Sequence, residues 1–331
     1  MPAWFEFLAC AAVIGVAGFE LARNADAIAE RTKLGGTWIG MILLATVTSL
    51  PELVTAVSAV TVAQAPDVTI GDVLGSCVFN LAILAVAEFF LREEPIFVKA
   101  SQSHIISGGF GVILLGIVAI GVLAPPMAKF SLAHIGLYTP VILVVYAIAA
   151  RTVFVHERRE RSEIVAIPRE ETPSLRRAAI GYGLAALFIL AAGLLLPFAA
   201  VDMAREMGWH TSFVGSIFVA ISTSLPEMAA TAGAIRLRAL DLAVGNLLGS
   251  NLFNIVILAV ADALFLKGPI LAHVSGAHAV SAVSAMVMTG AVIVGLRYRP
   301  VGRVFRTVGW VSVFLLLMFG LNTYLIYVWG R

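Results

Sequence analysis

Residues 45–52 read Ala-Thr-Val-Thr-Ser-Leu-Pro-Glu, and residues 220–227 read Ala-Ile-Ser-Thr-Ser-Leu-Pro-Glu. Each copy is followed by a second shared element, Gly-Asp-Val-Leu-Gly-Ser-Cys-Val-Phe-Asn at 71–80 and Gly-Asn-Leu-Leu-Gly-Ser-Asn-Leu-Phe-Asn at 245–254. Both Pro-Glu pairs lie in apolar runs long enough to cross a membrane. Because a proline and a carboxylate are costly at membrane depth, their duplication indicates a cation site built from two related halves.

The composition identifies a membrane protein. Of 331 residues, 60% are hydrophobic and 13% are charged, and the mean hydropathy is +0.98. Lipid is therefore the expected surroundings. The net charge of +2 gives no reason to expect nucleic acid. The spacing of the two cysteines, Cys10 and Cys77, matches no metal-binding motif, and nothing in the sequence supports a disulfide between them. We expect no cofactor and no obligate protein partner.

We predict an all-α fold of ten membrane-spanning helices, each needing about 20 apolar residues. The expected spans are 4–22, 36–61, 69–91, 103–124, 132–152, 178–201, 212–235, 242–265, 271–296 and 307–329. The two spans with Pro-Glu should be broken, because proline interrupts helical hydrogen bonding. A polar linker, 153–177, separates a first half, 1–152, from a second half, 178–331. The repeats cover about 40–88 in the first half and about 215–262 in the second.

The distribution of basic residues predicts the orientation. Loops on one side carry 18 of the 22 Lys and Arg residues, and that side should be cytoplasmic. Both termini then lie outside, in the plasma membrane, or in the inner membrane if the source is bacterial. Five spans in each half is an odd number, so the second half enters the membrane from the opposite side. The two halves therefore form an inverted repeat.

The repeated segments carry oxygen donors at helical spacing. Hard cations prefer carboxylate, carbonyl, hydroxyl and amide oxygens. Residues four apart share a helix face, and two carboxylates can neutralise one divalent ion. The pairs with this spacing are Thr48 with Glu52, Thr223 with Glu227, Ser76 with Asn80, and Ser250 with Asn254.

These motifs resemble those of the calcium:cation antiporter superfamily, which includes the sodium/calcium exchangers. Its two repeats carry [GS]-T-S-x-P-E followed by G-[ND]-x-x-G-S-N-x-x-[ND]. The resemblance implies a ten-helix fold with Glu52 and Glu227 as central calcium ligands. It also implies that Asn80 and Asn254 complete the central layer. The further cation ligands that it implies are Thr48, Thr223, Ser49, Ser224, Ser76 and Ser250, with the carbonyls of Ala45 and Ala220.

The chain departs from this pattern at positions that affect ion coupling. Asn254 stands where many sodium-coupled members carry Asp, and Cys77 replaces an Asn. The central layer then has two acidic groups, to which Asp72 could add a third. A proton could replace sodium, since buried carboxylates bind protons more readily than exposed ones. Coupling to Na⁺ or H⁺, and preference for Ca²⁺ or Mn²⁺, stay open.

Structural roles are the alternatives to ligation. The buried acids, amides and hydroxyls could instead bond between helices or to carbonyls freed by the prolines. Asp72 could serve a helix N-terminus. The acids near span ends are expected to be solvated or to line a vestibule; they are Asp67, Asp241, Glu88 and Asp262.

The function predicted from these residues is antiport of Ca²⁺ against Na⁺ or H⁺ by alternating access. A passive cation channel is the main alternative of another class. An intramembrane enzyme is not expected, because the chain has no His-Glu-x-x-His motif and neither repeat contains a histidine.

Overall fold

A computed structural model describes residues 3–91, 95–124, 130–162, 173–206, 222–300, 302–304 and 308–329. These residues are mainly helical, in agreement with the predicted fold class. The apolar runs form helices because a helix satisfies its own backbone hydrogen bonds where water is absent.

Most predicted spans have a matching helix. Eight described helices are long and apolar enough to cross a membrane, and a broken pair, Gly36–Thr48 with Leu50–Thr61, would make a ninth. The eight are α1 (Ala3–Thr32), α5 (Pro66–Phe89), α7 (Ser103–Leu123), α9 (Tyr138–Ser162), α10 (Leu175–Glu206), α14 (Leu240–Leu264), α15 (His278–Tyr298) and α16 (Trp310–Trp329). The span predicted at 212–235 begins outside the described residues, and its described part is α13 (Leu225–Arg236). A multi-pass protein is therefore confirmed, while the count of ten helices stays a prediction.

The chain divides into two compact units. One contains Met1–Pro51 and Phe154–Leu247, and the other contains Glu52–Val153 and Leu248–Arg331. Each unit therefore combines segments of both halves of the sequence, including parts of both repeats.

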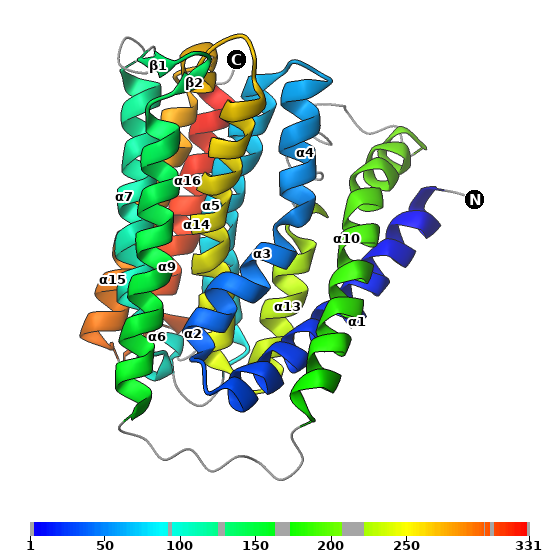
Figure 1. Cartoon of the computed structure of the whole chain (residues 1–331), viewed down its shortest axis with the longest axis vertical. Coiled ribbons are helices and arrows are strands. Elements are labelled where there is room, and N and C mark those ends of the chain that lie inside the picture. Colours follow the sequence, from blue (N-terminus) through cyan, green and yellow to red (C-terminus); the bar gives the residue numbers. More distant parts are fainter. Residues whose placement is uncertain are drawn as a thin grey trace. The chain divides into compact units, whose positions relative to one another are not determined.

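In the first unit, α1 packs along α10 and α13 (Figure 1). The core between these helices is built from small and aliphatic side chains, such as Leu21 and Ala25 of α1 and Ala185 and Ile189 of α10. A Cβ added at Gly233 of α13 would lie 2.9 Å from a backbone atom of α1. Close approach of backbones is how helices associate in lipid, where no hydrophobic force drives them together.

The broken helix also begins in the first unit. It consists of α2 (Gly36–Ile39), a π-helical turn η1 (Gly40–Leu44) and α3 (Ala45–Thr48), before α4 (Leu50–Thr61) follows. The carboxylate of Glu157, from α9, accepts hydrogen bonds from the N–H groups of Thr37 at 3.0 Å and Trp38 at 2.9 Å. A carboxylate satisfies the free donors of a helix N-terminus and interacts favourably with the helix dipole.

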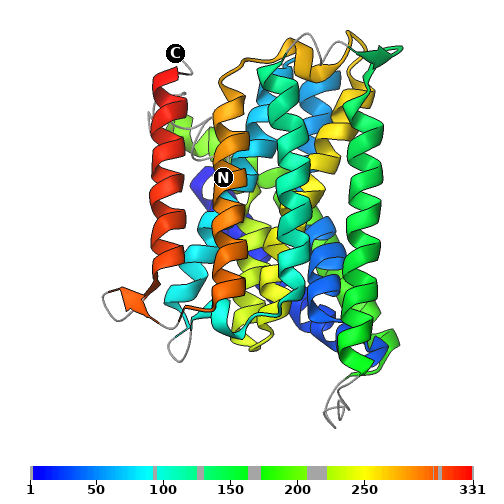
Figure 2. The same ribbon diagram turned by 90° about the vertical axis from the view of Figure 1, so that its left-hand side faces the viewer.

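In the second unit, α15 packs against α5, α7 and α16, and Figure 2 shows α16 (red), α15 (orange) and α7 (teal) side by side. Short elements connect these helices. They are α6 (Ile96–Lys99), the 3₁₀ turn η3 (Ile270–His273), and two antiparallel strand pairs, β1 (Ser131–Leu132) with β2 (Ile135–Gly136) and β3 (Arg303–Val304) with β4 (Val308–Gly309). The strands are the one departure from an all-α chain in the described residues.

Candidate functional site

The two Pro-Glu segments adopt the same local backbone. Ser49 has φ −90° and ψ 10°, and Ser224 has φ −88° and ψ 6°. Each serine directly precedes a helix whose first turn contains the proline. A proline is tolerated there, because the N–H that it lacks would have no hydrogen-bond acceptor within the helix. The break predicted in the first copy is therefore confirmed. In the second copy the segment before Ser222 lies outside the described residues, and with it the predicted ligand Ala220.

The first unit brings predicted ligands from both copies into contact. Ser49 donates a hydrogen bond to Oε1 of Glu227 at 2.8 Å. Thr48 donates to the carbonyl of Ala45 at 3.4 Å and to Oδ1 of Asn246 at 3.3 Å. All of these side chains are buried, as are Thr223 and Ser224. Residues 178 positions apart thus share one polar cluster, as the repeat predicts.

Asn246 is a member of this cluster that the sequence analysis did not assign. Its side-chain nitrogen donates to the hydroxyl of Thr231 at 3.1 Å and to the carbonyl of Glu227 at 3.4 Å. Asn246 therefore connects Thr48 of the first copy with the helix that carries Glu227. The available signal was its place in the repeat, because it occupies the position that Asp72 holds in the first copy.

Two glycines allow this cluster to form. A Cβ at Gly40 would lie 2.6 Å from the carbonyl oxygen of Leu242, and one at Gly245 would lie 2.7 Å from the carbonyl oxygen of Thr37. Both contacts involve backbone atoms that cannot move aside cheaply. By contrast, a Cβ at Gly75 would meet nothing within 4 Å among the described residues.

The second unit holds the remaining predicted ligands, and several have open oxygens. Asp72, Ser76 and Asn80 follow one another at intervals of four along α5, while Ser250 and Asn254 lie on α14. The buried atoms that make no hydrogen bond within the described residues include Oδ2 of Asp72, Oγ of Ser76, and Oδ1 of Asn80 and Asn254. Glu52 is also buried, with 1% of its surface exposed.

Unsatisfied buried oxygens are rare and costly, so their concentration on the repeated motifs needs a physical reason. An oxygen that accepts no hydrogen bond is available to a cation. Among the described residues no group of three or more His, Cys, Asp and Glu side chains is placed to hold a metal. The open oxygens named above belong to one carboxylate, one hydroxyl and two amides, and hard cations prefer oxygens of these kinds.

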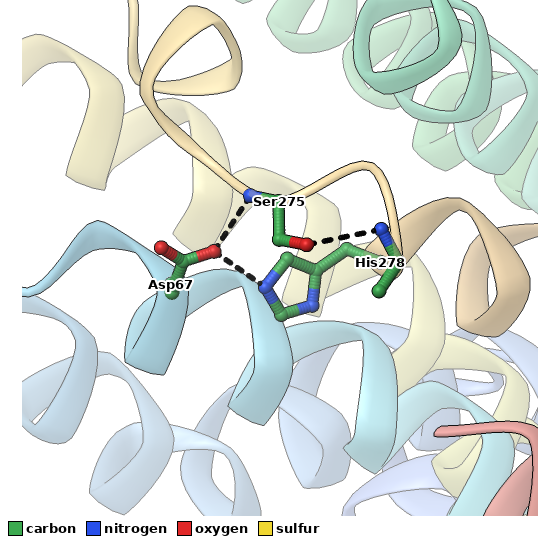
Figure 3. Close-up of polar contacts among 4 residues, drawn as sticks. Asp67, Ser275 and His278 are labelled. Atoms are coloured by element: carbon green, nitrogen blue, oxygen red, sulfur yellow. Dashed lines mark hydrogen bonds and ion pairs between the residues drawn. The ribbon is translucent and has the colours of Figure 1, made fainter. Parts of the chain in front are cut away.

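Asp72 is not placed as a helix cap. The first turn of α5 begins at Pro66 and contains Asp67, whereas Asp72 lies in the following turn. Asp67 is the acid at the helix end, and it is partly exposed as expected. Its Oδ1 accepts hydrogen bonds from the N–H of Ser275 at 2.7 Å and from the ring of His278 at 2.9 Å (Figure 3).

Two acids near span ends are buried, contrary to the expectation of a solvated or vestibular position. Asp262 is 0% exposed and accepts four hydrogen bonds, one from β2, two from the first turn of α9 and one from η3. Glu88 is also 0% exposed, and it accepts the N–H of Gly309 at 2.9 Å. Connecting segments fold back over these carboxylates, so both acids hold loops in place.

Comparison with known proteins gives a consistent picture. CaxA of Alkalimonas amylolytica is 28% identical over 259 residues, covering 76% of this chain and 77% of CaxA. The inner membrane protein YrbG of Escherichia coli is 28% identical over 240 residues, covering 70% of each chain. A structure of the sodium-calcium exchanger NCX_Mj has the same fold, with a TM-score of 0.76 and 19% identity over 97% of this chain and 98% of the exchanger.

The family assignment rests on a match to both halves of the sequence. The sequence model of the family described as "Sodium/calcium exchanger protein" matches residues 2–155 and 177–328. These ranges contain both repeats and omit the polar linker. The chain is a member of the sodium/calcium exchanger protein family, a family of cation antiporters.

Proposed function

We propose that this protein exchanges Ca²⁺ for Na⁺ across the plasma membrane, or the inner membrane of a bacterium, by alternating access. The observation that carries the proposal is the set of buried oxygens without hydrogen bonds on the two repeats. Membership of the sodium/calcium exchanger family supports the choice of ions. Structures of NCX_Mj soaked with Na⁺ and with Ca²⁺ belong to the same fold. The exchange needs no cofactor and no partner protein.

The proposed ligands come from both copies of the motif. Glu52 and Glu227 supply the charge that balances a divalent ion, and Ca²⁺ takes six to eight oxygen ligands in proteins. Neutral oxygens complete this number. The proposed ligand set is Glu52, Glu227, Thr48, Thr223, Ser49, Ser224, Asn80, Asn254, Ser76, Ser250 and Asp72, with the carbonyls of Ala45 and Ala220.

A second candidate is exchange of Ca²⁺ or Mn²⁺ for H⁺, in which Glu52 and Glu227 carry the protons. Asn254 favours this candidate, because an amide cannot balance the charge of a bound Na⁺ as a carboxylate does. The open Oδ1 of Asn254 remains a neutral ligand in either scheme.

The deciding experiment is ⁴⁵Ca²⁺ uptake into proteoliposomes with an outward Na⁺ gradient or an outward H⁺ gradient. Uptake driven by Na⁺ alone supports the first candidate, and uptake driven by H⁺ alone supports the second. Uptake that needs neither gradient indicates a passive channel. The variant Glu52→Gln should lose all uptake, whereas Glu20→Gln, a partly exposed acid paired with Arg23 on α1, should keep it. Full activity of Glu52→Gln would refute the assigned site.

We also propose the topology that the charge pattern predicts, with ten spans, both termini outside and linker 153–177 in the cytoplasm. The concentration of Lys and Arg on one set of loops supports it. A reporter that is active on one side of the membrane, fused after Arg331, tests this proposal. Activity on the cytoplasmic side would overturn it.

A further inference from the structure

Cys77 and Asn251 occupy equivalent positions in the two copies, 174 residues apart, on α5 and α14. Both are buried in the second unit, with 0% and 4% of their surfaces exposed. Their contacts are reciprocal. The side-chain nitrogen of Asn251 donates to the carbonyl of Cys77 at 3.0 Å, and the thiol of Cys77 donates to the carbonyl of Asn251 at 3.7 Å.

Each member of this pair also holds one of the two amides proposed as cation ligands. The side-chain nitrogen of Asn80 donates to Oδ1 of Asn251 at 3.1 Å. At the equivalent position of the second copy, the side chain of Asn254 interacts with the thiol of Cys77. The same residue pair thus contacts both amides, one from each copy of the motif.

These contacts determine which atom each amide presents. In Asn80 the nitrogen donates to Asn251, and in both Asn80 and Asn254 Oδ1 is a buried atom that makes no hydrogen bond among the described residues. Rotating the Asn80 amide by 180° would place its oxygen against Oδ1 of Asn251, two acceptors, and lose the bond. The Asn80 amide is therefore held with its oxygen, the atom that a cation uses, left open, and the Asn254 oxygen is open as well.

We infer that Asn251 and Cys77 are positioning residues that fix the Asn80 and Asn254 amides for cation binding. This inference rests on the proposed function. The contact of Asn251 with Asn80 is stronger than that of Cys77 with Asn254, because an amide oxygen is a good hydrogen-bond acceptor and a thiol sulfur is a weak one. Asn80 is therefore fixed more firmly than Asn254, and the equivalent halves of the repeat contribute unequally to ion affinity.

A residue swap tests the inference. Asn251→Cys removes the firm hold on Asn80 and should raise the KM for Ca²⁺ about tenfold, the effect of losing one orienting hydrogen bond. The double variant Cys77→Asn with Asn251→Cys rebuilds the hold on the opposite amide, and its KM should return to within about threefold of wild type. Cys77→Asn alone gives both amides a strong acceptor and should lower the KM about threefold.

The matched control is Asn322→Cys, the same substitution at a buried asparagine of α16, which should leave the KM unchanged. Ca²⁺ titration calorimetry of the purified variants gives the affinity without turnover. Thermal unfolding without ions shows whether each variant folds. A purely structural role would reduce Vmax and thermal stability in Asn251→Cys while leaving KM and affinity unchanged.

The outcomes separate the two proposals. An unchanged KM in Asn251→Cys and in Cys77→Asn would overturn this inference, even if wild type transports Ca²⁺. A double variant as weak as Asn251→Cys would overturn it too, provided that the variant folds. If wild type neither binds nor transports Ca²⁺, the proposed function fails, and this inference fails with it.

Discussion

Asp262→Asn offers a sharp test of the reasoning about buried acids, because it changes one atom at a fully buried group. In the wild type, Oδ1 accepts from the hydroxyl of Tyr138 at 2.6 Å and the N–H of Ile270 at 2.7 Å. Oδ2 accepts from the N–H of Gly136 at 2.8 Å and the hydroxyl of Thr139 at 2.5 Å. Each carboxylate oxygen therefore faces one hydroxyl and one backbone N–H.

An amide cannot accept at both positions. Whichever way the substituted side chain turns, its nitrogen faces a hydroxyl, which can rotate and accept, and a backbone N–H, which cannot. One backbone donor is left unsatisfied at a cost of about 1–3 kcal/mol, and the remaining bonds lose the charge that strengthens them. We expect a total loss of about 2–4 kcal/mol of stability.

Thermal unfolding of the purified protein in detergent measures this loss. For a chain of this size we expect the midpoint to fall by about 3–6 °C, on the entropy scale of globular proteins. The control is Glu20→Gln, which removes the same charge from a partly exposed ion pair with Arg23. Such surface pairs contribute about 0–1 kcal/mol, so this midpoint should move by about 1 °C or less. Equal shifts in the two variants would refute the assignment of Asp262 as a loop anchor.

Three further substitutions test contacts in the first unit. Gly245→Ala should cost about 1–3 kcal/mol, because its Cβ would overlap a backbone carbonyl, whereas Gly75→Ala in the second unit should be tolerated; equal melting temperatures would contradict this. Glu157→Ala removes the carboxylate that accepts hydrogen bonds from the first N–H groups of α2. The local stability of α2 should fall by about 1 kcal/mol, so hydrogen exchange at these amides should become about fivefold faster; unchanged exchange would show that this carboxylate does not stabilise the helix. Tyr182→Phe removes the 2.6 Å hydrogen bond from the hydroxyl to the carbonyl of Leu43, and the stability measured by thermal unfolding should fall by about 1 kcal/mol. An unchanged stability would show that this hydrogen bond does not stabilise the protein.

The sequence predicted those parts of the fold that depend on local chemistry. Apolar run length placed the long helices, and Pro51 predicted the break that the structure has at Ser49. Hydropathy ended the fifth span at residue 152, yet α9 continues to Ser162, because charged residues such as Arg and Glu are good helix formers. The π-helical turn at Gly40–Leu44 could not be predicted, because it leaves no distinct periodic pattern in the sequence.

In the candidate site, too, some residues could be predicted from the sequence and others could not. Comparison of the two copies of the motif pointed to Glu52 and Glu227, and both carboxylates are buried in the structure. The roles of Asn246 and Asn251 depend on which helix crosses which, so position in a motif alone could not assign them. The burial of Asp262 depends on a loop more than 120 residues away, and proximity to a span end suggested the opposite.

The interleaved composition of the two units has a consequence for biosynthesis. The first unit contains Met1–Pro51 together with Phe154–Leu247. Helix α1 therefore cannot pack against α10 and α13 until the ribosome has translated the second half of the chain. Until then, Thr48 and Ser49 have been inserted without Asn246 and Glu227, their later hydrogen-bond partners. A fragment truncated before α10 should therefore expose unsatisfied polar groups within the membrane, and we expect cellular quality control to degrade it rather than retain it as half a transporter.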